Sequence, residues 1–336
     1  MTHCDEIPLD RMRFGVVLND LDDGVLSTPR DLSGWVLDRA TPREMTVLRP
    51  EIHSWARAHN GLLDPGQEFT ITRSGGGFRF EPIPDATKWR YAVVRPTPDA
   101  ALNGARLAQA LRISDADLWV EHWTADKPPA SDGPDISSGG SPAQCVQFFA
   151  RITPSSLPEK VDVAHLQDVV ALRASLDERQ FPGVVRAIEL FRELDVVPEH
   201  SRTKLLGYFG VVESLLSHAP APQDPVDSIT RQLKRNLILL DHRLPVERGL
   251  GLRDFPDVSG PEQVIGRLYS YRSALAHGGD GEDPLAWLER RRPPTWSEWF
   301  PRTWLHHFMR RLTQRVLVSA LREPQLVTDL KGVEHL

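Results

Sequence analysis

The sequence predicts an α+β domain at the N-terminus, over residues 1–155, followed by an all-α helical bundle over residues 156–330. Three observations predict this division. The chain has 336 residues, whereas a single domain usually has about 100–200. Apolar residues recur with a period near two in the first half and with a period near 3.6 from Glu159 onward. A segment rich in Pro, Ser, Gly and Asp lies shortly before the change of period.

Short alternating or β-branched runs between turn residues predict six strands in the first domain. These strands span residues 12–18, 45–48, 69–72, 78–80, 89–94 and 145–152. Ser74-Gly75-Gly76-Gly77 joins the third and fourth as a hairpin from Phe69 to Ile83. A phosphate-binding loop is the less favoured interpretation, because a second strand and not a helix follows the glycines. Helical patterns over residues 51–59 and 100–111 complete the α+β class.

The segment from 124 to 144 is predicted to be a mobile loop. Its composition, for example Lys127-Pro128-Pro129-Ala130-Ser131-Asp132-Gly133-Pro134, offers little apolar surface to offset the entropy of ordering. A strand is still expected over 145–152, so the domain boundary is placed after it, near 153–158.

The second half predicts a helical bundle. Ser201 can cap the clearest helix, in which apolar residues recur at positions 205, 208, 209, 212, 215 and 216. The remaining helical patterns span residues 163–176, 184–194, 226–240, 262–277 and 302–321.

Composition excludes several classes of protein. The formal charge is −6, from 40 basic and 46 acidic residues, which argues against nucleic-acid binding through bulk charge. The two cysteines, Cys4 and Cys145, form neither a zinc motif nor a disulfide framework. No apolar stretch approaches the roughly 18 residues of a membrane span, and Asp5 and Glu6 lie where an export signal needs positive charge. We therefore expect a cytoplasmic protein without a membrane segment.

One helix combines a cation with a histidine. Arg272 falls within the apolar face of the 262–277 helix, where a guanidinium must be paired or line a cleft. His277 lies at the predicted helix end, before Gly278-Gly279. A histidine can transfer protons near neutral pH. A second Arg-x4-His spacing, Arg302 to His307, lies in an ordinary amphipathic helix and is interpreted as structural.

Three segments carry a family resemblance: LGYFGVVESLLSH (206–218), SITRQLKRNLILL (228–240) and LYSYRSALAHGG (268–279). Over about residues 160–322 the chain resembles the HEPN superfamily and is most similar to its Apea-like group. The family's mark is an Arg followed, four to six residues later, by a His, which Arg272 and His277 match. A polar Asn, Asp or His often follows the family's Arg, whereas this chain has Ser273.

The resemblance implies an endoribonuclease that needs no metal and no cofactor. The 2′-hydroxyl of single-stranded RNA would attack the adjacent phosphate, with Arg272 stabilising the charge that develops and His277 transferring protons. Ser273 and Tyr271 would orient the site, and Glu213 would support it. Members of the family often act as toxins or in phage defence, which implies regulation by a sensor or an antitoxin partner.

The spacing of Arg272 and His277 raises a geometric problem. On one regular helix they lie about 140° apart around the axis and about 7.5 Å apart along it. Either the helix unwinds at its glycine end, or two copies of the chain supply a composite site. The family commonly pairs its domains, so the resemblance implies a homodimer.

Other interpretations stay open. Arg272 can be a structural residue paired with Glu213 or Asp241, while His277 merely ends its helix. The bundle would then be a non-catalytic module for RNA binding and dimerisation, or part of a regulatory adaptor.

A second basic region lies near the C-terminus. Eight arginines and two glutamates between 286 and 322 give 8 − 2 = +6, with Trp296, Trp299 and Trp304 among them. Arg310, Arg311 and Arg315 are the candidate RNA-binding residues. A solvated helix with core tryptophans has the same composition.

Overall fold

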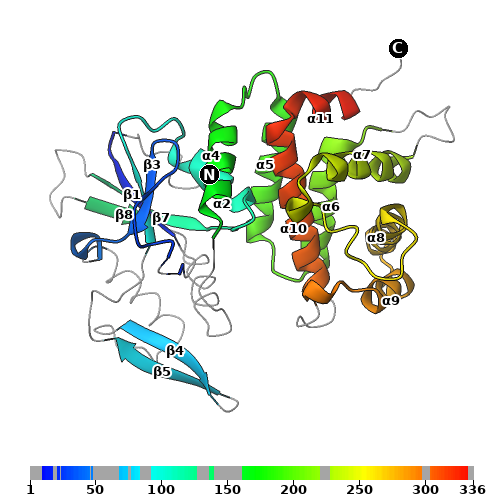
Figure 1. The fold of residues 1–336 in the computed structure, drawn as a ribbon, viewed down its shortest axis with the longest axis horizontal. Helices are drawn as coiled ribbons and strands as arrows, with labels where there is room; N and C mark the ends of the chain where they lie inside the picture. Colours follow the sequence, from blue (N-terminus) through cyan, green and yellow to red (C-terminus); the bar gives the residue numbers. More distant parts are fainter. Residues whose placement is uncertain are drawn as a thin grey trace. The chain divides into compact units, whose positions relative to one another are not determined.

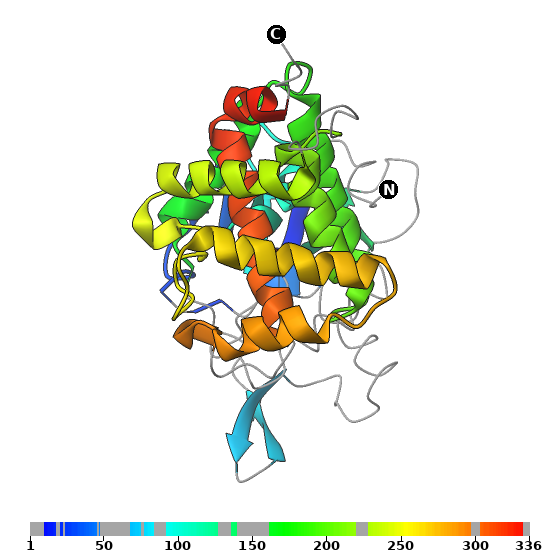
Figure 2. The same cartoon turned by 90° about the vertical axis from the view of Figure 1, so that its right-hand side faces the viewer.

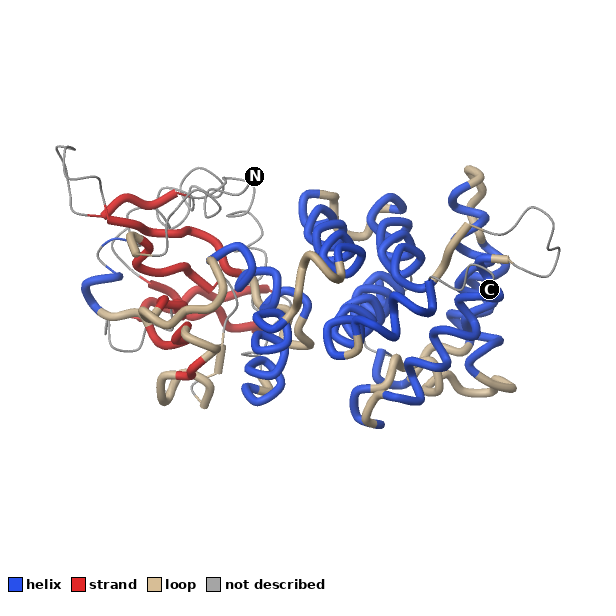
Figure 3. Tube along the Cα trace, turned by 90° about the horizontal axis from the view of Figure 1, so that it is seen from above, coloured by secondary structure: helices blue, strands red, loops and turns tan. Residues whose placement is uncertain are grey.

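A computed structural model describes most of the chain, and its strands and helices separate along the sequence (Figure 1). The described residues are 10–17, 21–22, 24–45, 47, 68–74, 77–83, 92–126, 136–139, 161–219, 228–296 and 303–331. The chain forms two compact units, Met1–Ala174 and Ser175–Leu336. Figure 3 shows the described strands in the first unit, while the second is helical. An α+β region followed by a helical region is therefore confirmed.

The first unit is built on a six-stranded sheet in the order β2-β3-β6-β1-β7-β8, and each neighbouring pair is antiparallel. A separate hairpin pairs β4 with β5, as predicted around the glycine turn. The strands are β1 (Met12–Val17), β2 (Arg30–Asp31), β3 (Trp35–Arg39), β4 (Glu68–Ser74), β5 (Gly77–Ile83), β6 (Ala92–Pro96), β7 (Val120–Asp126) and β8 (Ile136–Gly139).

Two tryptophans fill the core of this unit. The rings of Trp35 and Trp123 meet edge to face, with 5.8 Å between centroids. Gly15 of β1 leaves room for Trp123, because a Cβ there would lie 2.7 Å from that ring. Helix α2 (Gly104–Ile113) begins beside them, and the Trp35 indole donates to the Leu102 carbonyl oxygen at 3.0 Å. This helix confirms the pattern over 100–111.

The strand expected over 45–48 is wrong, because residues 42–45 are helical. A capping box starts this turn: the Thr41 backbone N–H donates to Glu44 Oε2 at 2.6 Å, and the Glu44 N–H donates to the Thr41 hydroxyl at 3.3 Å. Pro42 occupies the first helical position, which suits its fixed φ. The Thr-Pro-x-Glu sequence is thus the signal that the strand interpretation overlooked.

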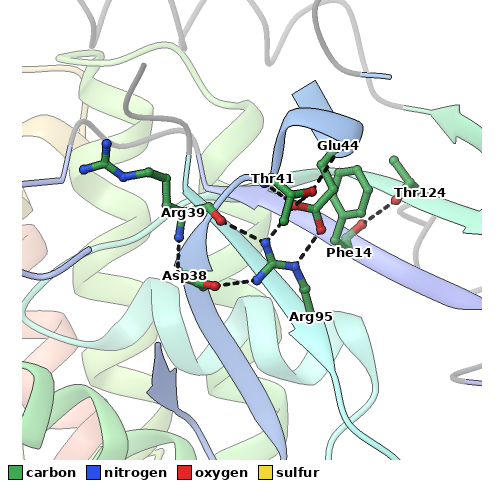
Figure 4. Close-up of polar contacts among 7 residues, drawn as sticks. All are labelled: Phe14, Asp38, Arg39, Thr41, Glu44, Arg95 and Thr124. Carbon is green, nitrogen blue, oxygen red and sulfur yellow. Dashed lines mark hydrogen bonds and ion pairs between the residues drawn. The ribbon is translucent and has the colours of Figure 1, made fainter. Parts of the chain in front are cut away.

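Figure 4 shows how the side chain of Glu44 ties this turn to the sheet. Arg95 of β6 donates to both Glu44 oxygens, at 2.6 and 2.7 Å, to Asp38 at 2.9 Å and to the Arg39 carbonyl at 2.9 Å. Burial favours the neutral acid, but the hydrogen bonds from Arg95 and Thr41 outweigh it and lower the pKa of Glu44. Four of the guanidinium's five N–H groups are used within the unit, so we interpret Arg95 as a structural brace.

The mobile loop predicted over 124–144 is wrong in both of the parts that the structure describes, 124–126 and 136–139. Residues 124–126 belong to β7, and β8 pairs with β7 over Ile136–Gly139. Composition measures how much apolar surface side chains can bury, whereas this pairing uses backbone N–H and C=O groups.

The division between the units lies later than the boundary expected near 153–158. Helix α4 (Val163–Ser175) belongs to the first unit up to Ala174 and contacts other elements of that unit. The Gln167 amide donates to the Asp31 carbonyl at 2.8 Å, and Arg173 donates to Gln109 at 3.1 Å. A boundary inferred from the change in the period of apolar residues assigns every helix after the change to the second domain, including a helix that packs on the first.

The second unit contains helices at or near the predicted positions, together with α9 and α11, which no pattern predicted. Ser201 caps α6 as expected, accepting from the Lys204 N–H at 3.1 Å. In Figure 2, α7, α8 and α9 lie one after another across α10. The helices are α5 (Pro182–Glu193), α6 (Arg202–Leu216), α7 (Ile229–Arg243), α8 (Pro261–Ala276), α9 (Glu282–Arg290), α10 (Thr303–Arg322) and α11 (Pro324–Lys331).

Two predicted elements, the helix over 51–59 and the strand over 145–152, lie outside the described residues. None of the described helices is long and apolar enough to span a membrane.

Candidate functional site

Helix α8 brings Arg272 to the inner face of the second unit. Val264, Ile265, Leu268 and Leu275 on this face are buried, whereas the side chain of Arg272 is 34 % exposed. The guanidinium is therefore neither sealed in the core nor fully in solvent.

Glu213 of α6 pairs with this guanidinium through two contacts. Arg272 Nη2 donates to Glu213 Oε2 at 3.0 Å, and Nε lies 3.0 Å from Oε1. The Glu213 side chain is 17 % exposed. Of the two carboxylates considered as partners, Asp241 is engaged elsewhere, since it accepts from the Leu250 N–H at 2.6 Å and from Arg253 at 3.0 Å.

His277 is exposed at the C-terminal end of α8. Its backbone N–H donates to the Ser273 carbonyl at 3.1 Å, so the helical hydrogen bonding continues up to it. Gly278 then takes a φ of +79°, and the Gly279 N–H donates to the Ala274 carbonyl at 2.8 Å. The helix does not unwind before His277, so the separation of about 140° from Arg272 remains.

The two supporting residues next to Arg272 lie in different surroundings. Ser273 is exposed. Tyr271 is buried, and its ring lies where a Cβ on Gly281 would have to be. Gly281 has a φ of +67°, which glycine adopts without strain. Tyr271 thus packs beneath the turn that follows α8.

Tyr269 is the tyrosine beside the ion pair, and the sequence interpretation missed it. Its ring meets Phe209 edge to face at 5.3 Å, and its buried hydroxyl makes no hydrogen bond within the described part of the chain. Burial raises the pKa of Tyr269 well above its usual value; the charge of Glu213 adds to the rise and that of Arg272 opposes it. The available signal was the i, i+3 spacing from Tyr269 to Arg272, which places both on one helix face.

The three arginines predicted to bind RNA do not share one exposed surface. Arg310 is buried, with 9 % of its surface exposed. Arg315 is half-buried and donates to the Gly249 carbonyl. Arg311 alone among the three is exposed. Trp304 is buried in the core, in contact with Phe255 and Phe308. For Trp304, core packing is thus the observed role.

A different cationic feature lies on α8 and α9. The guanidinium carbons of Arg267 and Arg291 lie 5.5 and 4.5 Å from the centre of the Trp287 ring. Arg267 is exposed, and Arg291 also donates to the Asp257 carbonyl at 3.2 Å. The i, i+4 spacing of Trp287 and Arg291 was the overlooked signal.

A histidine cluster lies between α10 and the turn before α6. The ring of His200 is 5.4 Å from that of His306 and 5.5 Å from that of His307. Lys204 is buried nearby and pairs with Glu199 at 2.5 Å. Burial and the positive charges of His200 and Lys204 lower the pKa of His306 to about 4, against the opposing charge of Glu199. Within the described ranges, no group of three or more His, Cys, Asp or Glu side chains could hold a metal ion.

Comparisons with known proteins assign neither a family nor a function to the chain. No family model matches it, and searches of curated proteins and of solved structures gave no significant match.

Proposed function

We propose that the helical unit is a HEPN-like domain that binds single-stranded RNA and cleaves it without a metal, using Arg272 and His277. The observation that carries the proposal is their placement at one end of α8, with Arg272 34 % exposed and His277 exposed. Both side chains are accessible to a ligand. The guanidinium can stabilise negative charge on a phosphate, and the imidazole can transfer protons.

The proposed reaction is an internal transfer at phosphorus. The 2′-oxygen loses its proton and attacks the adjacent phosphorus, and the bond to the 5′-oxygen breaks as that oxygen gains a proton. The products are a 2′,3′-cyclic phosphate and a 5′-hydroxyl. Because α8 stays helical up to His277, we place the reacting groups in a site shared by two copies of the chain. In each site His277 of one copy accepts the proton from the 2′-oxygen and then donates a proton to the leaving 5′-oxygen, while Arg272 of the other copy holds the phosphate.

Incubation of the full chain with single-stranded RNA in the presence of a chelator tests this proposal. We expect products with cyclic phosphate ends and no cleavage of DNA, which lacks the 2′-hydroxyl. His277→Ala should abolish cleavage with little change in stability, because this side chain is exposed. His242→Ala is a matched control, since His242 is also exposed in the last turn of a helix. Equal cleavage by His277→Ala and the wild type would refute the assignment.

A second candidate is a non-catalytic RNA-binding and dimerisation module. The Arg272–Glu213 pair favours it, since such a pair also serves to join α6 to α8. Binding of RNA without cleavage, unaffected by His277→Ala, would support this function. A role in toxin activity or phage defence, with a sensor or antitoxin partner, stays a prediction.

A further inference from the structure

The contacts of Arg272 bear on how the proposed site would be regulated. Glu213 covers the Nε and Nη2 edge of the guanidinium, which is an edge that can receive two oxygens of a phosphate. The pair is neutral as a whole, and its carboxylate repels an approaching phosphodiester. As observed, Arg272 therefore offers little net attraction to RNA.

The polar atoms around this pair are incompletely bonded. Glu213 Oε1, Arg272 Nε and the Tyr269 hydroxyl are buried and make no hydrogen bond within the described part of the chain, although Nε and Oε1 are ion-paired. Tyr269 is 7 % exposed. A buried hydroxyl without a partner is unfavourable. Within the described part of the chain Tyr269 is thus a hydrogen-bond donor without an acceptor; it lies one turn before Arg272 on α8, and its ring meets Phe209, which lies one turn before Glu213 on α6.

We infer that Glu213 is an internal competitor for the phosphodiester at Arg272, and that Tyr269 binds Glu213 when RNA displaces it. In the observed state the carboxylate is held by Arg272. In the RNA-bound state Arg272 turns to the phosphate, and the Tyr269 hydroxyl donates to Glu213, so that the carboxylate does not lose every partner. This inference rests on the proposed function and identifies an RNA phosphodiester as the ligand of Arg272.

The binding of a short single-stranded RNA with every 2′-hydroxyl methylated tests the inference, because methylation blocks cleavage. Glu213→Gln should bind this RNA roughly two- to fivefold more tightly than the wild type, as expected for loss of a partly exposed ion pair. Glu262→Gln, which removes an exposed carboxylate at the start of α8, should change affinity much less. Weaker or unchanged binding by Glu213→Gln would overturn the inference, since Glu213 would then merely position Arg272.

Tyr269→Phe provides a second variant that removes no observed hydrogen bond. We expect its melting temperature to equal or exceed that of the wild type and its RNA affinity to fall. Tyr208→Phe, on α6 and facing Phe191, should leave affinity unchanged. In the Glu213→Ala background, Tyr269→Phe should have little further effect, because no acceptor remains at position 213. Additive effects of the two substitutions would overturn the inference.

The same assay separates the two proposals. Wild-type binding that persists in Arg272→Ala would refute RNA binding at this site and the inference with it. Binding that requires Arg272 but does not increase in Glu213→Gln or Glu213→Asp would refute the inference alone. RNA binding by Glu213→Gln when the wild type shows none would support both.

Discussion

Arg272 and His306 show how the surroundings of a single residue determine its chemistry. Arg272 lies on the apolar face of a helix, and Glu213 on a neighbouring helix balances its charge. His306 is buried beside His200 and Lys204, so its neutral form is favoured. An arginine is a cation in any of these surroundings, so Glu213 affects where Arg272 lies and not its charge, whereas the surroundings of His306 determine whether its ring is charged.

The histidine cluster predicts a dependence of stability on pH. The pKa of His306 is about 4 in the folded chain and about 6.5 in the unfolded chain. Below pH 6.5 the unfolded chain therefore binds a proton that the folded chain does not, and stability should fall until about pH 4, by roughly 3 kcal/mol in total. Chemical denaturation across this range measures the effect.

Two variants isolate the contribution of His306. His306→Gln should flatten the curve between pH 6.5 and pH 4, because the titrating group is gone. His242→Gln, at an exposed position, should leave it unchanged. A curve that is equally steep in His306→Gln would show that another group is responsible.

The residues at helix ends determine where the two helices that carry Glu213 and Arg272 begin and end. Ser201 starts α6, which carries Glu213, and the turn at Gly278 to Gly281 ends α8, which carries Arg272. Gly278 and Gly281 both have positive φ values, +79° and +67°. The two positions differ in how much space a new side chain would have. Comparing alanine substitutions at both therefore separates the cost of backbone strain from the cost of steric overlap.

Gly281→Ala should cost more stability than Gly278→Ala. Both substitutions place a side chain at positive φ, which costs about 1 kcal/mol. At Gly281 the new Cβ would also overlap the Tyr271 ring, whereas at Gly278 nothing lies within 4 Å. We therefore expect a total loss of about 2–4 kcal/mol for Gly281→Ala. Thermal unfolding of the two variants measures the difference, and equal losses would contradict it.

Ser201→Ala tests the start of α6. Its hydroxyl accepts from the Lys204 N–H, so we expect a loss of about 1 kcal/mol. Thr203→Ala, at an exposed position within the same first turn, should change stability by much less. Equal effects of the two substitutions in urea denaturation would show that the cap contributes little.

For the whole molecule, the proposed chemistry requires two copies. The regular hydrogen bonding of α8 up to His277 keeps that residue away from Arg272 of the same chain. A two-fold assembly can bring Arg272 of one copy toward His277 of the other. The closed symmetry of a dimer would repeat the arrangement on both sides of the axis.

We predict that the full chain is a dimer at micromolar concentration. Light scattering should give twice the chain mass of 37.8 kDa. If the site is composite, mixing Arg272→Ala with His277→Ala chains should restore part of the cleavage that each lacks alone. Monomers that retain full cleavage would contradict the shared site.

The sequence by itself determined the α+β-then-helical order, the β4–β5 hairpin and the start of α6 at Ser201. These features depend on local chemistry: the period of apolar residues, the freedom of glycine and the capping hydroxyl of serine. The sequence also placed Arg272 on an apolar helix face, which needs only the geometry of one element, and suggested Glu213 and Asp241 as partners without deciding between them.

The tertiary structure alone decided the rest, because contacts between distant segments do not show in a local pattern. It paired Arg272 with Glu213 and not Asp241, placed Tyr269 beside that pair, and buried Arg310. It also paired β8 with β7 despite a composition typical of loops, and packed α4 on the first unit. Each outcome depends on which backbone or charged group a neighbouring element presents, and only the folded chain brings those groups together.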